Sequence, residues 1–335
     1  MIIDFRSDTV TKPSPLMLDF MFKAEVGDDV FGEDPTINEL ERLGAEMFGM
    51  EAGLYCTSGT QTNQIAINVH TNPGDEVICH EEAHIYRYEG GGIARNSQVS
   101  CRFLRGNFGR INPEEIVENI NPDNLHYPVT TLVSIEDTAN RGGGKVYDFK
   151  DVKRINEICK EHNLKFHLDG ARVFNALAIN GVDPKEYGGQ FDSISICLSK
   201  GLGAPVGSLL LGSKEFIHKS RRVRKYLGGG MRQAGIIAAG AIYALNNNIE
   251  RLKEDHRRAL EIERILKDQD WIQEVITVET NIVVGILKNP KDQQKIIENF
   301  KSKGILVVDF GLGRIRITTH LDITDEHIKF FKENI

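Results

Sequence analysis

Apolar residues along the chain recur with two spacings, one typical of amphipathic helices and one typical of buried strands. Residues 151–163 carry apolar side chains every three or four positions, which predicts a helix. The runs 76–80, 164–169 and 191–198 are short and apolar or alternating, which predicts strands. Since strand-like and helical stretches alternate without a linker, we expect one large α/β domain with a mostly parallel sheet over residues 31–245.

The pattern changes after this region, and we expect a small C-terminal α/β domain over residues 246–335. Strands are predicted at 281–287, 305–310 and 314–319, and helices at 291–303 and 325–334. Residues 1–30 contain Pro13, Pro15 and one helical stretch. We therefore expect an N-terminal arm that is ordered by packing on something else, such as a neighbouring subunit.

Composition narrows the class of protein. The five cysteines are odd in number and widely spaced, so the sequence predicts neither a disulfide framework nor a metal site, and a reducing cytoplasm is the expected setting. The first ten residues are too charged for a signal peptide, and no apolar run reaches membrane-spanning length. A net charge of -7 argues against nucleic acid as a partner. The one basic cluster, at 221–225, is interpreted as a solvated helix face.

Two polar residues follow predicted strands in a pattern that indicates pyridoxal phosphate. Asp169 ends the run 164–169, and Lys200 follows the run 191–198. This cofactor needs a lysine amine to form an imine with its aldehyde, and an acid to keep its pyridine nitrogen protonated. Alone, such a lysine is usually solvated and such an aspartate usually forms a turn. Together, at strand ends where open α/β sheets bind ligands, they predict a cofactor site.

Other candidate residues are less specific. A strand, a tight turn at 58–61 and a helix would direct the Gly59 and Thr60 amides at a phosphate, although an ordinary serine helix cap explains the same residues. His84 follows the strand 76–80 and could stack on a cofactor ring and move protons, although a loop histidine is more often polar surface. His126 has the same ambiguity. His80 and His84 complete no known zinc motif, so no metal is expected.

Several stretches of the chain resemble the low-specificity L-threonine aldolases, and the resemblance spans nearly the whole length. The matching stretches are 6–11 (RSDTVT), 26–36 (VGDDVFGEDPT), 58–61 (SGTQ), 169–172 (DGAR), 196–203 (ICLSKGLG), 227–233 (LGGGMRQ) and 316–324 (RITTHLDIT). The resemblance implies the aspartate aminotransferase-like fold of pyridoxal phosphate-dependent transferases. It also implies the cofactor, pyridoxal 5'-phosphate.

Carried over to this sequence, the resemblance makes Lys200 the Schiff-base lysine, Asp169 the partner of the pyridine nitrogen and His84 the residue stacked on the ring. Gly59 and Thr60 would bind the phosphate.

The resemblance also assigns groups around the substrate. Ser7, Arg172 and Arg316 would hold the substrate carboxylate, with Arg172 also beside the cofactor, and guanidinium groups suit bidentate pairing. His84 and His126 would lie near the β-hydroxyl group.

Two basic residues, Lys225 and Arg232, match groups that reach the cofactor phosphate of a neighbouring subunit. At least a dimer is therefore expected, and a homotetramer as in the family. One loop departs from the family pattern, because Ala139 stands where the family has a histidine, while Asn140 is retained.

The expected activity is that of a carbon–carbon lyase, an aldehyde-lyase that converts L-threonine or L-allo-threonine to glycine and acetaldehyde. Another pyridoxal phosphate-dependent lyase of the β-eliminating kind, or an aminotransferase, would use the same lysine and aspartate. A non-catalytic binder would need neither Lys200 nor the histidines. A nucleotide-binding protein is disfavoured, because the chain has no Walker or G-x-G-x-x-G pattern. The sequence leaves open which threonine diastereomer is preferred.

Overall fold

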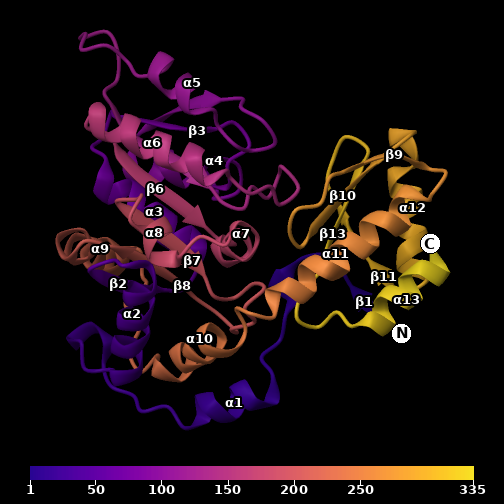
Figure 1. The fold of residues 1–335 in the computed structure, drawn as a ribbon. Helices are drawn as coiled ribbons and strands as arrows, with labels where there is room; N and C mark the ends of the chain where they lie inside the picture. The colour runs from indigo at the N-terminus through magenta and orange to yellow at the C-terminus, as the bar shows by residue number, and fades with distance from the viewer.

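A seven-stranded sheet forms the centre of the larger part of the protein (Figure 1). The computed structural model describes all residues 1–335. The strand order is β2-β8-β7-β6-β5-β3-β4, and only β8 runs against the direction of the others. The strands are β2 (Ala52–Cys56), β3 (Glu76–His80), β4 (Ser100–Leu104), β5 (Thr130–Glu136), β6 (Lys165–Gly170), β7 (Ser193–Cys197) and β8 (Ser208–Gly212). The predicted α/β class with a mostly parallel sheet is confirmed.

Helices cover both faces of this sheet, which explains why its inner strands are apolar on both sides. Leu54 and Leu210 pack in a cluster with α3 and α9 on one face, whereas their neighbours Tyr55 and Leu209 belong to the main core on the other face. The main core contains 40 buried residues. The helices are α2 (Pro35–Phe48), α3 (Gly59–His70), α4 (His84–Arg87), α5 (Pro113–Glu118), α6 (Phe149–Glu161), α7 (Val173–Asn180), α8 (Pro184–Gly188), α9 (Lys214–Tyr226) and α10 (Gly235–Asn247).

The C-terminal part has its own antiparallel sheet and its own core of 19 buried residues. The sheet has the order β12-β13-β10-β9. Its elements are α11 (Leu252–Lys267), β9 (Ile272–Ile276), β10 (Ile282–Leu287), α12 (Gln293–Ser302), β11 (Ile305–Leu306), β12 (Val308–Asp309), β13 (Arg314–Thr318) and α13 (Asp325–Asn334). The prediction of a single strand over 305–310 is wrong. Two short strands lie there instead, of which β11 pairs with the N-terminal segment and β12 pairs with β13.

The N-terminal arm joins the two parts within one chain. Its strand β1 (Ile3–Asp4) pairs in parallel with β11, and Phe5 packs edge-on against Phe331 at 5.5 Å. Its helix α1 (Pro15–Phe22) then packs against α10 at the far end of the larger part (Figure 1). The arm thus finds the packing partner it needs in its own chain. The boundaries of the predicted domains stay predictions.

Helix α9 is not the uniformly solvated basic face that its sequence suggested. Arg224 is buried, pairs with the buried Asp29 at 2.8 Å and donates to the Tyr55 carbonyl at 2.6 Å.

None of the helices combines the length and apolar character that a bilayer span requires.

Candidate active site

The predicted cofactor residues gather where the strands of the large sheet end. Asp169 is the second-to-last residue of β6, Lys200 follows β7, and Gly59 opens α3 shortly after β2. His84 opens α4 after β3, and Glu136 is the last residue of β5. Because these strands run in the same direction, their carboxyl ends meet at one edge, the usual ligand position in open α/β sheets.

The Asp169 carboxylate is buried, with 2% of its surface exposed, and both of its oxygens are held. Oδ1 accepts a hydrogen bond from the Ala171 amide at 3.2 Å, and Oδ2 accepts one from Asn63 Nδ2 at 2.9 Å. Asn63 Nδ2 also donates to Glu89 Oε1 at 2.9 Å. The acid that would face a pyridine nitrogen is therefore fixed in place rather than mobile.

His84 lies beside this acid and is oriented by carboxylates. Its Nδ1 is 3.0 Å from Glu89 Oε1, and its backbone amide donates to Glu136 Oε2 at 3.1 Å. Burial lowers the pKa of His84, but the Glu89 hydrogen bond and the charges of Asp169 and Glu136 outweigh it, so the pKa is raised. With Nδ1 donating to Glu89, the neutral ring presents Nε2 as a proton acceptor.

Ligand atoms of His84, Glu89 and Asp169 lie within 4.8 Å of one another, a spacing that a metal ion could use. Hydrogen bonds account for this spacing without one, because Asn63 and His84 supply donors to the carboxylates. His80 Nδ1 accepts a hydrogen bond from the Glu82 amide at 3.0 Å, and His80 is not one of the three residues whose ligand atoms lie together.

Lys200 and the start of α3 have free groups that suit a phosphorylated aldehyde. The Lys200 amine has no hydrogen bond or ion pair with the chain, while its carbonyl accepts from Thr11 Oγ1 of the arm at 3.1 Å. Ser58 caps α3 by accepting from the Gln61 amide, and the Gly59 and Thr60 amides have no acceptor in the chain. A free amine, a held acid and unpaired amides at a helix start are the groups that pyridoxal phosphate requires.

Arg172 differs from its expected arrangement. Its Nε and Nη2 atoms each lie 2.7 Å from a carboxylate oxygen of Asp8, and both side chains are buried. The bidentate face of the guanidinium is therefore occupied by Asp8, which leaves Nη1 for a ligand. Ser7 Oγ accepts from the Thr9 amide at 3.3 Å and caps the turn that carries Asp8.

Arg316 reaches the same region from β13 of the smaller sheet. Its Nη1 donates to Asn140 Oδ1 at 3.0 Å and its Nη2 to the Arg6 carbonyl at 2.9 Å, while its buried Nε has no partner. Burial and the nearby Arg172 lower the pKa of Arg316 to about 10. Arg316 has no carboxylate partner in the chain, so its guanidinium charge could pair with the carboxylate of an anionic ligand.

Ala139, where the family has a histidine, lies under a neighbouring loop. A β-carbon added to Gly109 would lie 2.6 Å from the Ala139 β-carbon. The Gly109 backbone can therefore lie close to Ala139 only because glycine carries no side chain.

Three predicted residues make no side-chain bond to these groups in the single chain. His126 is exposed in the loop before β5, so a seven-residue strand, about 20 Å long, separates it from the site. Lys225 is exposed without an ion pair, and the exposed Arg232 pairs with Asp28 at 2.8 Å. Neither basic residue bonds to the turn at 58–61, although the segment between them approaches this turn, since a β-carbon added to Gly229 would clash with the Gln61 side chain.

Sequence reasoning missed the groups that hold the catalytic candidates, namely Asn63, Glu89, Glu136 and Asp8. Asn63 lies four residues after Gly59, one helical turn along the same face, and this spacing was a usable signal. The others come from loops and strand ends whose neighbours depend on strand order.

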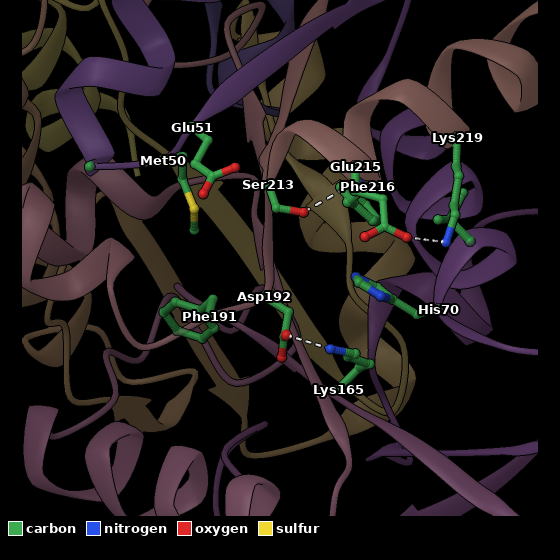
Figure 2. Close-up of a pocket in the computed structure, with 12 residues that line it drawn as sticks. Met50, Glu51, His70, Lys165, Phe191, Asp192, Ser213, Glu215, Phe216 and Lys219 are labelled. Carbon is green, nitrogen blue, oxygen red and sulfur yellow. Dashed lines mark hydrogen bonds and ion pairs between the residues drawn. The ribbon is translucent and has the colours of Figure 1, made fainter.

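A cavity of about 420 Å³ lies at the opposite edge of the sheet (Figure 2). It is bordered by ion pairs, Lys165 with Asp192 at 2.9 Å and Lys219 with Glu215 at 2.8 Å. No predicted site residue lines it. It is therefore distinct from the candidate active site.

Solved structures share this fold. A threonine aldolase from Leishmania major superposes with a TM-score of 0.84 at 22% identity, covering 98% of this chain and 97% of that chain. A serine palmitoyltransferase from Sphingomonas wittichii superposes with a TM-score of 0.77 at 15% identity, covering 99% and 86%. The fold and the free amine, held acid and helix start at its strand ends define a pyridoxal phosphate-dependent enzyme of the aspartate aminotransferase-like fold.

Sequence relatives narrow the class. The beta-eliminating lyase family matches residues 4–289. The probable low-specificity L-threonine aldolase 2 of Arabidopsis thaliana is 41% identical, covering 98% of this chain and 94% of the relative. The low specificity L-threonine aldolase of Escherichia coli is 40% identical, covering 98% and 96%. The chain belongs to the beta-eliminating lyase family and, within it, to the low-specificity L-threonine aldolases.

Proposed function

We propose that this protein cleaves L-threonine and L-allo-threonine to glycine and acetaldehyde, with pyridoxal phosphate as its cofactor. The observation that carries the proposal is the position of His84, a carboxylate-oriented imidazole beside Asp169. Retro-aldol cleavage needs a proton acceptor for the β-hydroxyl group next to the cofactor ring, and His84 Nε2 supplies one.

Four residues would hold the cofactor. Lys200 offers its amine to the aldehyde, Asp169 offers its fixed carboxylate to the pyridine nitrogen, and the Gly59 and Thr60 amides receive the phosphate. When bound, pyridoxal phosphate supplies a ring that accepts the electron pair of a bond broken at the α-carbon.

The substrate would be oriented by its carboxylate. Arg316 has no carboxylate partner of its own, and Arg172 keeps Nη1 available while Asp8 holds the rest of its guanidinium. A carboxylate held at a fixed position places the Cα–Cβ bond for cleavage. His84 takes the β-hydroxyl proton as that bond breaks, acetaldehyde leaves, and the α-carbon gains a proton to give glycine.

The assembly is proposed to be a homotetramer acting on free amino acids in the cytoplasm, as part of amino-acid metabolism. Its support is that Lys225, Arg232 and His126 are exposed and that their side chains make no hydrogen bond or ion pair with the residues of the chain's own candidate site. In the assembly, Lys225 and Arg232 would reach a neighbour's cofactor phosphate, and His126 a neighbour's substrate.

The test is the visible spectrum of the purified protein with added L-allo-threonine, while acetaldehyde is followed by an alcohol dehydrogenase coupling. A yellow protein that releases acetaldehyde and glycine in equal amounts supports the proposal. Lys200→Ala is the control, and it should lose both the covalent cofactor and the activity.

The family match to beta-eliminating lyases favours one second candidate function, β-elimination. Release of pyruvate and ammonia from L-serine, without acetaldehyde from either threonine, would establish that reaction instead.

A further inference from the structure

A continuous line of polar side chains runs from Asp169 through the protein to the opposite edge of the sheet. Asn63 Nδ2 lies 2.9 Å from Asp169 Oδ2, and Asn63 Oδ1 lies 3.1 Å from His167 Nε2. His167 Nδ1 lies 2.8 Å from Ser193 Oγ, which lies 2.8 Å from His70 Nε2. Asn63, His167 and Ser193 are buried, so no bulk water competes for these bonds.

The outer end of the line lies at the cavity of Figure 2. His70 is the last residue of α3, and its ring stacks on Phe216 with centroids 4.5 Å apart. Both residues line the cavity. The line therefore joins the candidate active site to a second, solvent-connected region of the protein.

The direction of every hydrogen bond follows from the carboxylates at the inner end. Asn63 Nδ2 faces Asp169 and Glu89, which only accept when ionised, so Asn63 Oδ1 must face His167. A carbonyl oxygen also only accepts, so His167 Nε2 carries a proton. If His167 is neutral, its Nδ1 accepts from the Ser193 hydroxyl, which in turn accepts from His70 Nε2.

Both histidines are neutral for a clear physical reason. Burial lowers the pKa of His167 to about 3 and the pKa of His70 to about 3, with Lys165 adding to the effect at His70. Each ring therefore carries one proton at neutral pH. All the donors of the line then point toward Asp169.

We propose that Asn63, His167, Ser193 and His70 form a positioning line that fixes the Asp169 carboxylate against the cofactor ring. This inference rests on the proposed cofactor role of Asp169. Hydrogen bonds aligned in one direction polarise each other in a low-dielectric interior, so each donor strengthens the next one. The outer residues thus act on the cofactor through Asn63 without touching it.

Charged groups that face Asp169 from other elements are His84 and Glu89 from the segment after β3, and Glu136 from the end of β5. These groups set the local field together with the line. The test therefore changes the line at its outer members and leaves the charged groups intact.

The test compares Ser193→Ala with Ser195→Ala in the holoenzyme. Both serines lie on β7 with 0% exposure, and Ser195 Oγ bonds to Thr62 Oγ1 at 2.6 Å, outside the line. A buried hydrogen bond contributes about 1 kcal/mol, and a barrier raised by that amount lowers a rate constant about fivefold. Ser193→Ala should lower kcat about fivefold, leave KM within twofold and shift the pH midpoint of the visible cofactor band. Ser195→Ala should leave that midpoint unchanged.

A second variant tests the connection to the outer end. His70→Phe keeps a ring that can stack on Phe216 but removes the hydrogen-bond donor to Ser193. His70 is only partly buried, so this variant also serves as the test if Ser193→Ala does not fold. Its effect on the band should disappear when it is combined with Ser193→Ala, because the line is then already broken. Nitrogen-15 NMR should find the proton of His167 on Nε2 in the wild type.

Two results would overturn the proposal: equal band midpoints for the Ser193→Ala and Ser195→Ala proteins, or a His70→Phe effect that persists in the Ser193→Ala background. These readouts need bound cofactor but no particular reaction. A protein that binds pyridoxal phosphate and releases no acetaldehyde would therefore refute the proposed function while the line is still judged by its spectrum and NMR signal.

Discussion

Substitution of Asp8 should destabilise the protein strongly, because this residue joins three parts of the fold at one point. Asp8 belongs to the N-terminal arm and is 0% exposed. Its carboxylate accepts two 2.7 Å hydrogen bonds from Arg172 of the large part and one 3.3 Å bond from Asn281 of the small part. Asp8→Ala leaves the Arg172 guanidinium buried without a counter-charge.

The expected cost is about 3–5 kcal/mol, the range for removing one partner of a buried ion pair. A matched control is available four residues earlier in the arm. Asp4 pairs with Arg6 at 2.6 Å, but their side chains are 25% and 53% exposed. An exposed pair contributes roughly 0–1 kcal/mol, so Asp4→Ala should change stability little.

The pH dependence has a definite sign. Burial opposes ionisation of Asp8, but the Arg172 charge and its hydrogen bonds outweigh burial and hold the pKa well below its usual range. A carboxyl group with a depressed pKa stabilises the fold above its unfolded pKa, and this contribution is lost as the pH falls. The stability difference between wild type and Asp8→Ala should therefore be constant at neutral pH and shrink below about pH 4.

The measurement is the urea midpoint of the holoenzyme at pH 7.5, converted to free energy with a shared slope. Asp8→Asn, which keeps the shape and removes the charge, separates the electrostatic part. A loss below about 1 kcal/mol for Asp8→Ala, or a loss equal to that of Asp4→Ala, would refute the buried-pair reasoning.

Three further predictions concern single contacts. Gly59→Ala places a β-carbon 2.6 Å from Cys197 Sγ, so we expect the free energy of urea unfolding to fall by roughly 1–3 kcal/mol. Adding Cys197→Ala to the same chain should recover part of this stability, and no recovery would contradict the clash. Burial raises the pKa of Asp137 from 3.8 to about 7, so the stability of the protein should fall as the pH rises from about 4 to 7. The Asp137→Asn protein should lack this pH dependence when the unfolding midpoints of the two proteins are compared across the range. Burial lowers the pKa of His167 to about 3, so its NMR signals should stay those of a neutral ring at pH 5, whereas protonation near pH 6 would contradict the buried neutral state.

The periodicity of the chain predicts most of the secondary structure, because it is a local property. The predicted strand 76–80 is β3, and the helix at 325–334 is α13. The position of Asp169 and Lys200 at the same edge of the large sheet was predictable for a similar reason, since both lie at the ends of strands and parallel strands end at one edge. Resemblance to a family added the groups near the substrate, and for these the sequence supplies identities but not contacts.

Tertiary structure alone decided which groups act on each other. Asp8 reaches Arg172 across 164 residues, and Ser193 reaches His70 across 123 residues. Such contacts depend on strand order and on the path of the N-terminal arm, and a local repeat carries no information about either. The same reason explains the break between β11 and β12, where neighbouring residues pair with strands from opposite ends of the chain. Sequence thus determined the elements and the chemistry available at their ends, whereas the packing of distant segments decided the partners, the protonation states and the orientation of each catalytic candidate.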